Sequence, residues 1–319
     1  MAELRNTFSW SFSAADDFDE CRRKRYWAKY AMWGGWSRDA DALARTAYRL
    51  TKMENRYSLQ GRAVELSVMW VLGQARGGSA VSSEEAYAEI ARPFLNRAWK
   101  ESRDGVWRAN PKKHCCLHEH YYAEPGSAAD KAWTQSVSDT TKTCIDNFIR
   151  LVLPELLEVR PESELEIATV ARGGDPESFS FEGVKVYAIP DYGYRTATGV
   201  RIYDWKSGKP REKHVAQLAL YGLWANTKHG LAASDIEVSI EYLASGERQR
   251  RCLAEADLAA VREKIVVSVQ DMREYLVDGD IARNEPLPGP DWELTENPRA
   301  CRMCNFYELC KPELDELSA

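Results

Sequence analysis

Four cysteines near the two ends of the chain restrict its fold more than any other feature of the sequence. Cys301, Cys304 and Cys310 lie within a ten-residue segment, close enough for one cation or cluster to bind all three thiolates. Such a centre needs a fourth ligand, and Cys21, near the other end of the chain, is the leading candidate. A centre shared by these residues would hold the C-terminal tail against the first helix.

The cellular compartment decides how these cysteines are interpreted. The sequence contains no run of about 18 apolar residues that could span a membrane, and its first residues lack the basic-then-apolar pattern of a secretory signal. We therefore expect a cytoplasmic protein, in which disulfides are rare and clustered cysteines are better explained as metal ligands. The alternative is a set of unrelated buried or free thiols. Zinc and an iron–sulfur cluster both accept four thiolates, so the spacing leaves both open.

The spacing of apolar residues predicts a mixed α/β fold. Over 319 residues, 44% are apolar and 29% are charged, which indicates a globular chain with a full core. Helical periodicity, then alternating segments between turns, then two further helices follow one another along the chain. The expected helices are Ala14–Trp33, Gln60–Gln74, Ser83–Lys100, His214–Lys228 and Ala254–Val277, and the expected strands are Glu164–Val170, Phe179–Ile189, Val200–Trp205 and Glu237–Leu243.

We expect this chain to form one domain over residues 1–319. Residues 1–160 are mainly helical and include the first of the clustered cysteines, residues 161–250 carry the sheet, and residues 251–319 carry a long helix and the cysteine-rich tail. The formal net charge of −6 argues against a protein that coats nucleic acid by its overall charge. Binding to an acidic polymer would therefore require a local basic patch.

Two acidic residues and a lysine are expected to meet at the edge of the sheet. Side chains alternate along a strand, so Asp204 and Lys206 share one face of the segment Val200–Lys206 while Trp205 points to the other. If Asp191 ends the preceding strand on the same side, two carboxylates and an ammonium group come together. This is the minimum set for Mg²⁺-assisted hydrolysis of a phosphodiester. The alternative is an ordinary surface ion pair at a strand end.

The two ends of the chain also resemble a known family. The segment Phe12-Ser-x-x-x-x-Phe18-x-x-Cys21, joined to a C-terminal Cys-x-x-Cys-x-x-x-x-x-Cys, is similar to the [4Fe–4S] staple of RecB/AddB-like exonucleases and CRISPR-adaptation nucleases in the PD-(D/E)XK superfamily. The resemblance implies a restriction-endonuclease-like central mixed sheet flanked by helices. It also implies a [4Fe–4S] cluster bound by the four cysteines named above.

The same resemblance implies roles for residues of the sheet and of the helix that follows it. In this family an aspartate closes one strand, an acidic residue and a lysine follow on the next, and a Gln-x-x-x-Tyr helix comes after. This chain has Asp191, then Asp204 with Lys206, then Gln217 and Tyr221. By resemblance, Asp191 and Asp204 hold Mg²⁺ or Mn²⁺, Lys206 positions the attacking water, and Gln217 and Tyr221 border the active site.

One position departs from the family pattern. Glu65 stands where these nucleases usually have a metal-binding histidine. A carboxylate can also bind a hard metal ion, so we expect Glu65 to be a third ligand. The alternative is a solvated helix residue.

By resemblance, the expected function is metal-dependent cleavage of DNA, as an exonuclease on single-stranded ends in repair, recombination or phage defence. A helicase or a defence-system protein is a candidate partner, and RNA as the substrate stays open. Two basic runs that adjoin aromatic residues are candidates for the path of the strand, and the alternative for each run is a solvated helix face. The residues chosen from them are Arg22, Arg23, Lys24, Trp99 and Arg108.

Two other functions compete with this interpretation. A catalytically inactive DNA-binding or assembly subunit could retain the fold and the staple. The reason to consider it is that Glu65 replaces the expected metal-binding histidine. A zinc-stapled interaction protein is the other. The segment His114–His120 adds a further ambiguity, because Cys116, His118 and His120 could bind zinc, line a substrate channel, or be partly buried polar residues.

Overall fold

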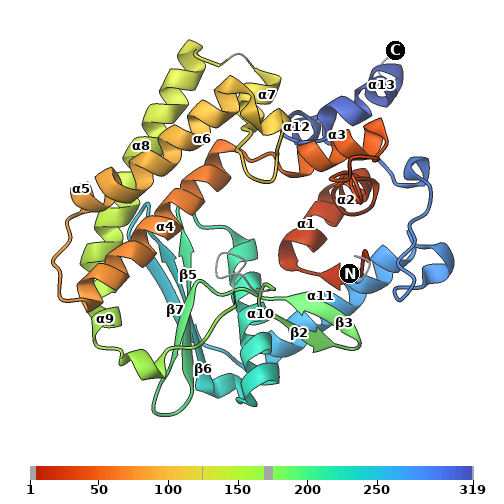
Figure 1. Cartoon of the computed structure of the whole chain (residues 1–319). Helices are drawn as coiled ribbons and strands as arrows, with labels where there is room; N and C mark the ends of the chain where they lie inside the picture. Colours follow the sequence, from red (N-terminus) through yellow and green to blue (C-terminus); the bar gives the residue numbers. More distant parts are fainter. Residues whose placement is uncertain (1–4, 124, 169–174, 318–319) are drawn as a thin grey trace.

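The structure is a computed structural model that describes residues 5–123, 125–168 and 175–317. Helices form its N-terminal half (Figure 1). They are α1 (Phe12–Glu20), α2 (Arg22–Tyr26), α3 (Ala42–Thr51), α4 (Arg56–Arg76), α5 (Ser83–Ala86), α6 (Arg92–Asp104), α7 (His118–Tyr122), α8 (Ala128–Asn147) and α9 (Leu153–Leu157). The expected helices at Gln60–Gln74 and Ser83–Lys100 are confirmed, the second as α5 and α6 joined by a π-helical turn.

The helix expected over Ala14–Trp33 is divided at Cys21. This residue has extended backbone angles, φ −163° and ψ 115°, and separates α1 from α2. The side chain of Ser11 caps the start of α1 by accepting a hydrogen bond from the backbone of Ala14 at 3.2 Å. The interruption turns the second helix away from the first, and a π-helical turn over Trp27–Ala31 continues it.

Most of the described strands lie in the C-terminal half and form two small sheets, the first of which also includes the N-terminal strand β1. The first has the strand order β1-β3-β2 and the second the order β4-β5-β6-β7. Strands β5 and β6 run parallel, with Asp204 paired to Ile240, whereas β4 and β7 run antiparallel to their neighbours. The strands are β1 (Ser9–Trp10), β2 (Ser178–Phe181), β3 (Val184–Tyr187), β4 (Tyr192–Arg195), β5 (Val200–Lys206), β6 (Ile236–Tyr242) and β7 (Glu247–Cys252).

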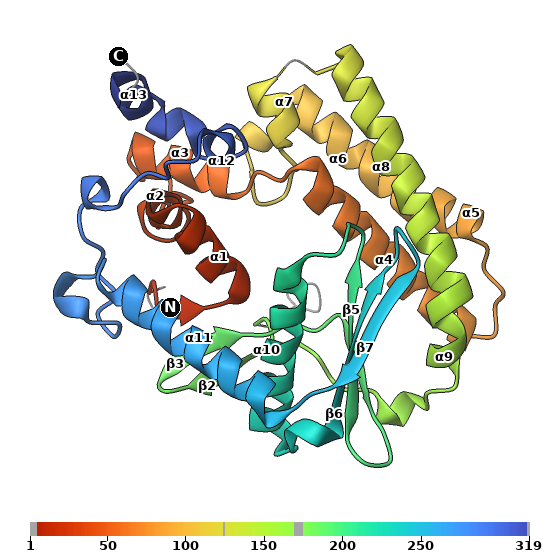
Figure 2. The same cartoon turned by 180° about the vertical axis from the view of Figure 1, so that it is seen from behind.

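Helices cover both faces of the four-stranded sheet (Figure 2). The crossover from β5 to β6 is helix α10 (Glu212–His229), and it buries apolar side chains against one face together with Ile202 and Ile240. The other face carries Tyr203 and Trp205, which pack against α4, α8 and α9. The alternation expected for β5 is therefore present, with Trp205 on the face opposite Ile202. The chain is a mixed α/β protein, as expected.

Two of the expected strands differ from the structure. The segment Phe179–Ile189 is a hairpin rather than one strand, because Glu182 and Gly183 both have positive φ, 47° and 78°, and form a tight turn between β2 and β3. The described part of Glu164–Val170 forms only an isolated bridge, from Glu164 to Tyr194. Residues 169 and 170 of that segment lie outside the described residues.

The C-terminal segment returns to the N-terminal helices. Helix α11 (Glu255–Arg273) ends near the three-stranded sheet, and α12 (Pro298–Arg302) and α13 (Tyr307–Leu317) lie beside α2 and α3 (Figure 1). A separate apolar cluster joins these parts and contains Trp27, Leu50, Phe306 and Cys310. None of the helices among the described residues is long and apolar enough to cross a membrane.

Candidate active site

A cleft of ≈ 870 Å³ opens between α4, the end of β5 and the start of α10. Asp191, Asp204 and Lys206 all line it. Asp204 and Lys206 are two residues apart on β5, so the pleat places both on the cleft side of the sheet. Contrary to expectation, Asp191 does not end a strand but directly precedes β4, the antiparallel neighbour of β5. The sheet therefore brings together the three groups that the sequence selected.

Hydrogen bonds fix these groups in place. One carboxylate oxygen of Asp191 accepts the backbone N–H of Trp205 at 2.6 Å. The ammonium of Lys206 lies 2.7 Å from Asp204 Oδ2 and donates to Gln217 Oε1 at 3.0 Å.

Helix α10 completes a closed ring of contacts around Asp204. The amide of Gln217 donates to the hydroxyl of Tyr221 at 2.8 Å, and that hydroxyl donates to Asp204 Oδ1 at 3.1 Å. Because Gln217 and Tyr221 are four residues apart, both side chains project from the same face of the helix. The two residues selected by resemblance therefore contact the carboxylate and lysine directly or through each other.

The electrostatics of the cleft favour a bound cation. Burial raises the pKa of Asp191 well above its ordinary value, and the nearby charge of Asp204 raises it further. Burial also raises the pKa of Asp204, although the charge of Lys206 opposes that shift. Two close carboxylates in a low-dielectric site repel each other, and a divalent cation would relieve this repulsion.

Glu65 lies on α4 and lines the same cleft. Its negative charge is a further reason why the pKa of Asp191 is raised. Burial raises the pKa of Glu65 itself, and the neighbouring Arg62 opposes the shift. The carboxylate of Glu65 is therefore close enough to Asp191 to raise the pKa of that carboxyl group.

Sequence reasoning missed several residues of the cleft. Arg62, Lys209 and Arg211 add positive charge to its lining, and the ring of Tyr57 stands at its rim with 59% of the residue exposed. A signal was present in the short basic segment that follows Lys206. His214 also lines the cleft, and burial together with the charges of Lys206, Arg211 and Lys213 lowers its pKa to about 4. This imidazole is therefore neutral near pH 7.

The comparison with protein families agrees with this geometry. The sequence matches the model of the PD-(D/E)XK nuclease superfamily over residues 9–311. The chain therefore belongs to the PD-(D/E)XK nuclease superfamily. No curated protein is similar enough in sequence to count as a match.

Members of this superfamily usually use Mg²⁺ or Mn²⁺, and the cleft fits such an ion. No group of three or more His, Cys, Asp or Glu side chains in the described parts of the chain is arranged to hold a metal by itself. Magnesium is commonly bound through only one or two carboxylates, with water and substrate phosphate completing its shell. Asp191 and Asp204 are two hard oxygen donors in the same cleft, so the donor set suits that mode of binding.

The four cysteines selected from the sequence line one small cavity of ≈ 20 Å³, together with Trp27 and Leu294. Cys21, in the break between α1 and α2, faces the three C-terminal cysteines across it. Burial raises the pKa of Cys304 to about 12 and that of Cys310 to about 11. The number and type of donors fit a four-thiolate centre, although the sulfur atoms do not form a ligand shell in this structure.

The five residues selected as DNA contacts lie apart from the cleft, and none of them lines it. Arg23 is only 5% exposed and binds Glu313 and the carbonyl of Trp292. Lys24 forms ion pairs with Asp17 and Glu20.

The other three differ in how freely they reach solvent. The guanidinium of Arg22 lies 3.9 Å from the ring centre of Phe18. Trp99 is partly buried and donates to Asp130. Arg108 is exposed and lines two surface hollows.

The histidines of the segment 114–120 each have a different neighbour. His114 lies 3.2 Å from Glu101, and His120 is buried between Ser102 and Asp130. His118 is buried against the ring of Tyr122. The structure does not gather them into a metal site.

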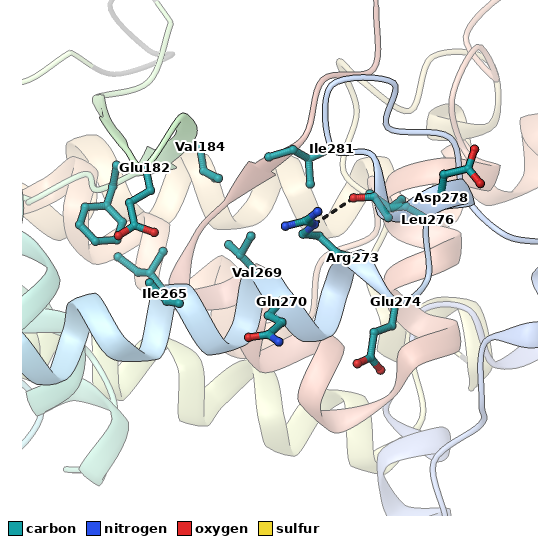
Figure 3. Close-up of a pocket in the computed structure, with 13 residues that line it drawn as sticks. Glu182, Val184, Ile265, Val269, Gln270, Arg273, Glu274, Leu276, Asp278 and Ile281 are labelled. Atoms are coloured by element: carbon teal, nitrogen blue, oxygen red, sulfur yellow. Dashed lines mark hydrogen bonds between the residues drawn. The ribbon is translucent and has the colours of Figure 1, made fainter.

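A second large hollow, of ≈ 650 Å³, lies between α11 and the β2–β3 hairpin (Figure 3). Its floor is apolar and its polar lining includes Glu182, Glu274 and Asp278. Arg273, the only arginine among the described residues that line it, donates to the carbonyl of Gly279 at 2.9 Å. This acidic lining does not suit a polyanion, so the cleft that holds Asp191 remains the candidate active site.

Proposed function

We propose that this chain is a metal-dependent deoxyribonuclease that degrades DNA from single-stranded ends. The observation that carries the proposal is the meeting of Asp191, Asp204 and Lys206 in a cleft that opens to solvent. Membership of the nuclease superfamily supports phosphodiester hydrolysis. The exposed ring of Tyr57 at the rim supports single strands, because unpaired bases can stack on it.

Each residue has a distinct part in the proposed reaction. Asp191 and Asp204, with Glu65 as a third carboxylate, would hold Mg²⁺ or Mn²⁺, which would neutralise charge on the phosphate and favour ionisation of a water molecule. Lys206 would orient the attacking water and stabilise negative charge that develops on the phosphoryl oxygens. Gln217 and Tyr221 would hold the side chains of Lys206 and Asp204 in position through their hydrogen bonds.

The four cysteines have a structural part in the proposal. We propose that Cys21, Cys301, Cys304 and Cys310 bind a [4Fe–4S] cluster that ties the C-terminal tail to the first helices. The cavity that all four cysteines line supports this assignment. The tail has little core of its own, so a cluster would stabilise its position. Brown protein that absorbs near roughly 400 nm is expected after anaerobic purification. Colourless protein with stoichiometric zinc would contradict the cluster without affecting the proposed cleavage.

The test of cleavage compares the wild-type chain with Lys206→Ala. End-labelled single-stranded and duplex DNA are incubated with Mn²⁺, and EDTA serves as the control. We expect the wild type to shorten single strands from an end and the variant to lose at least 100-fold in rate while it still binds DNA. A circular single strand, which has no end, should resist digestion. Binding without any product would favour an inactive DNA-binding subunit.

A further inference from the structure

A second surface, outside the cleft, has the composition of a site for single-stranded nucleic acid. Two adjoining hollows of ≈ 540 and ≈ 490 Å³ share Arg49 and Arg108 in their linings. Around these two residues the second hollow adds three more cations. We call the five cations together with Trp36 the arginine surface, and its residues are Trp36, Arg38, Arg45, Arg49, Arg108 and Lys112.

The positive charge of the arginine surface is not neutralised by the protein. None of its five cations forms an ion pair with a carboxylate in the parts of the chain that the structure describes. Among the residues that the structure describes, none that lines the second hollow is acidic, and Glu308 is the only acidic residue that lines the first. The charge of Lys112 also lowers the pKa of Lys52, after the larger effect of burial. In a chain with net charge −6, such a cluster attracts a polyanion locally.

Exposed aromatic rings accompany these cations. Trp36 is 44% exposed and Trp33 is 37% exposed, and their ring centres lie 5.0 Å apart. The ring of Trp36 also contacts Tyr48 on α3, at 5.8 Å between centres. The turn that carries it approaches α3 closely, because a Cβ on Gly35 would lie 2.2 Å from the carbonyl oxygen of Ala44. The exposed indole is therefore held on the surface, where an unpaired base can stack on it.

The arginine surface leads toward the cleft. Arg49 lies in the last turn of α3, and Tyr57 follows it by eight residues, at the start of α4 and at the rim of the cleft. Figure 2 shows α3 leading directly into α4. One strand can therefore pass from the cleft, over Tyr57, to the end of α3.

We propose that the arginine surface binds the part of a single-stranded nucleic acid that extends beyond the cleft. Phosphates contact the arginines and a base stacks on Trp36. The inference rests on the proposed function, since it assumes that the strand's end occupies the cleft. It adds a second binding region that sets the length of strand the protein prefers.

The test measures binding in the Lys206→Ala background, so that cleavage does not consume the probe. Fluorescence anisotropy gives the affinities of labelled oligothymidylates of 6 and 20 nucleotides, with EDTA present. Trp36→Ala is expected to lower the affinity ratio of the 20-mer to the 6-mer about 5- to 150-fold, in line with the stacking of one base. The double variant Arg49→Gln/Arg108→Gln is expected to reduce the salt slope for the 20-mer by about 1.4, that is about 0.7 for each lost phosphate contact.

Two controls separate this binding from general effects. Arg150→Gln removes an exposed charge, paired with Asp146, that lines neither hollow, and it should leave the ratio and the slope unchanged. The glutamine variants leave Trp36 and its packing in place, and their circular dichroism and melting temperature should match those of the parent. They therefore report on charge even if Trp36→Ala fails to fold.

Several results would overturn the proposal. The first is an affinity ratio of the 20-mer to the 6-mer that neither Trp36→Ala nor the double glutamine variant alters. The second is binding of duplex DNA as tight as that of single strands, with the same dependence on Trp36. Oligouridylate of 20 nucleotides distinguishes RNA from DNA, and tighter binding of RNA would overturn DNA as the ligand. If the wild type does not cleave DNA but the affinity ratio of the 20-mer to the 6-mer still depends on Trp36, only the proposed function is contradicted.

Discussion

Arg23 provides the sharpest contrast between a sequence-based expectation and the structure. It lies in the basic run after Cys21, which predicted contact with DNA, yet it is 5% exposed. Its Nε donates to the carbonyl of Trp292 at 2.8 Å, and its terminal nitrogens donate to both carboxylate oxygens of Glu313 at 2.8 and 3.3 Å. We predict that Arg23→Met destabilises the fold and leaves DNA affinity unchanged.

The magnitude follows from these contacts. The charged hydrogen bond to the Trp292 carbonyl contributes about 1.5–3 kcal/mol. The pair with Glu313, a carboxylate that is 47% exposed, adds ~0.2–1 kcal/mol after solvent screening. The loss is therefore roughly 2–4 kcal/mol in the free energy of unfolding, and methionine keeps most of the buried volume.

Chemical denaturation of both proteins, followed by tryptophan fluorescence, measures this difference. Arg22→Met is the matched control, because its guanidinium is partly exposed and contacts the ring and carbonyl of Phe18 and the carboxylate of Asp19; its loss should be below about 1 kcal/mol. The reasoning is refuted if Arg23→Met unfolds at the wild-type denaturant concentration, or if the folded variant binds DNA at least tenfold more weakly than wild type.

Three further predictions concern the cleft. Tyr221→Phe removes the hydroxyl that donates to Asp204 and should lower kcat about tenfold with little change in KM; steady-state kinetics test this, and wild-type kcat would count against it. Glu65→Gln should raise the Mn²⁺ concentration at half-maximal rate about tenfold or more, with Glu65→Asp less affected; equal metal dependence in all three proteins would exclude Glu65 as a ligand. Because the pKa values of Asp191 and Asp204 are raised, protons compete with the metal for these carboxylates. The apparent Mn²⁺ affinity should therefore rise between pH 5 and 8, by up to about tenfold per pH unit for each proton displaced. Calorimetry that finds an Mn²⁺ affinity independent of pH would contradict this.

The same pKa directions determine the pH dependence of stability in the metal-free protein. A carboxyl group whose pKa is raised on folding binds its proton more tightly in the folded chain than in the unfolded chain. Stability therefore falls as the pH rises through the ordinary aspartate value toward the raised values of Asp191 and Asp204. A bound divalent ion removes this penalty, so the melting temperature should increase with Mn²⁺, and more at pH 8 than at pH 5.

Local pattern was sufficient for part of the site. Alternation along β5 predicted that Asp204 and Lys206 share a face opposite Trp205, because the pleat fixes side-chain direction at a period of two. Helical spacing likewise predicted that Gln217 and Tyr221 project together. The convergence of these residues with Asp191 needed the antiparallel pairing of β4 and β5, which the sequence allowed but did not require.

The sequence did not predict contacts between residues that lie far apart in the chain. Nothing near Arg23 indicates that its partner, Glu313, lies 290 residues away, whereas Arg108, which the same reasoning selected, remains exposed. The extended backbone at Cys21 was missed because its flanks are good helix formers, and tertiary contacts outweigh that preference. The hairpin turn at Glu182–Gly183 did carry a signal, since glycine beside a polar residue between two apolar runs is typical of a tight turn.

Anomalous diffraction from crystals soaked in Mn²⁺ tests the central claim most directly. We predict a peak within coordination distance of both Asp191 and Asp204, and no peak there in crystals of Asp204→Asn. A manganese ion bound elsewhere with this cleft left vacant, or the same peak in Asp204→Asn, would contradict a catalytic metal site at the end of β5.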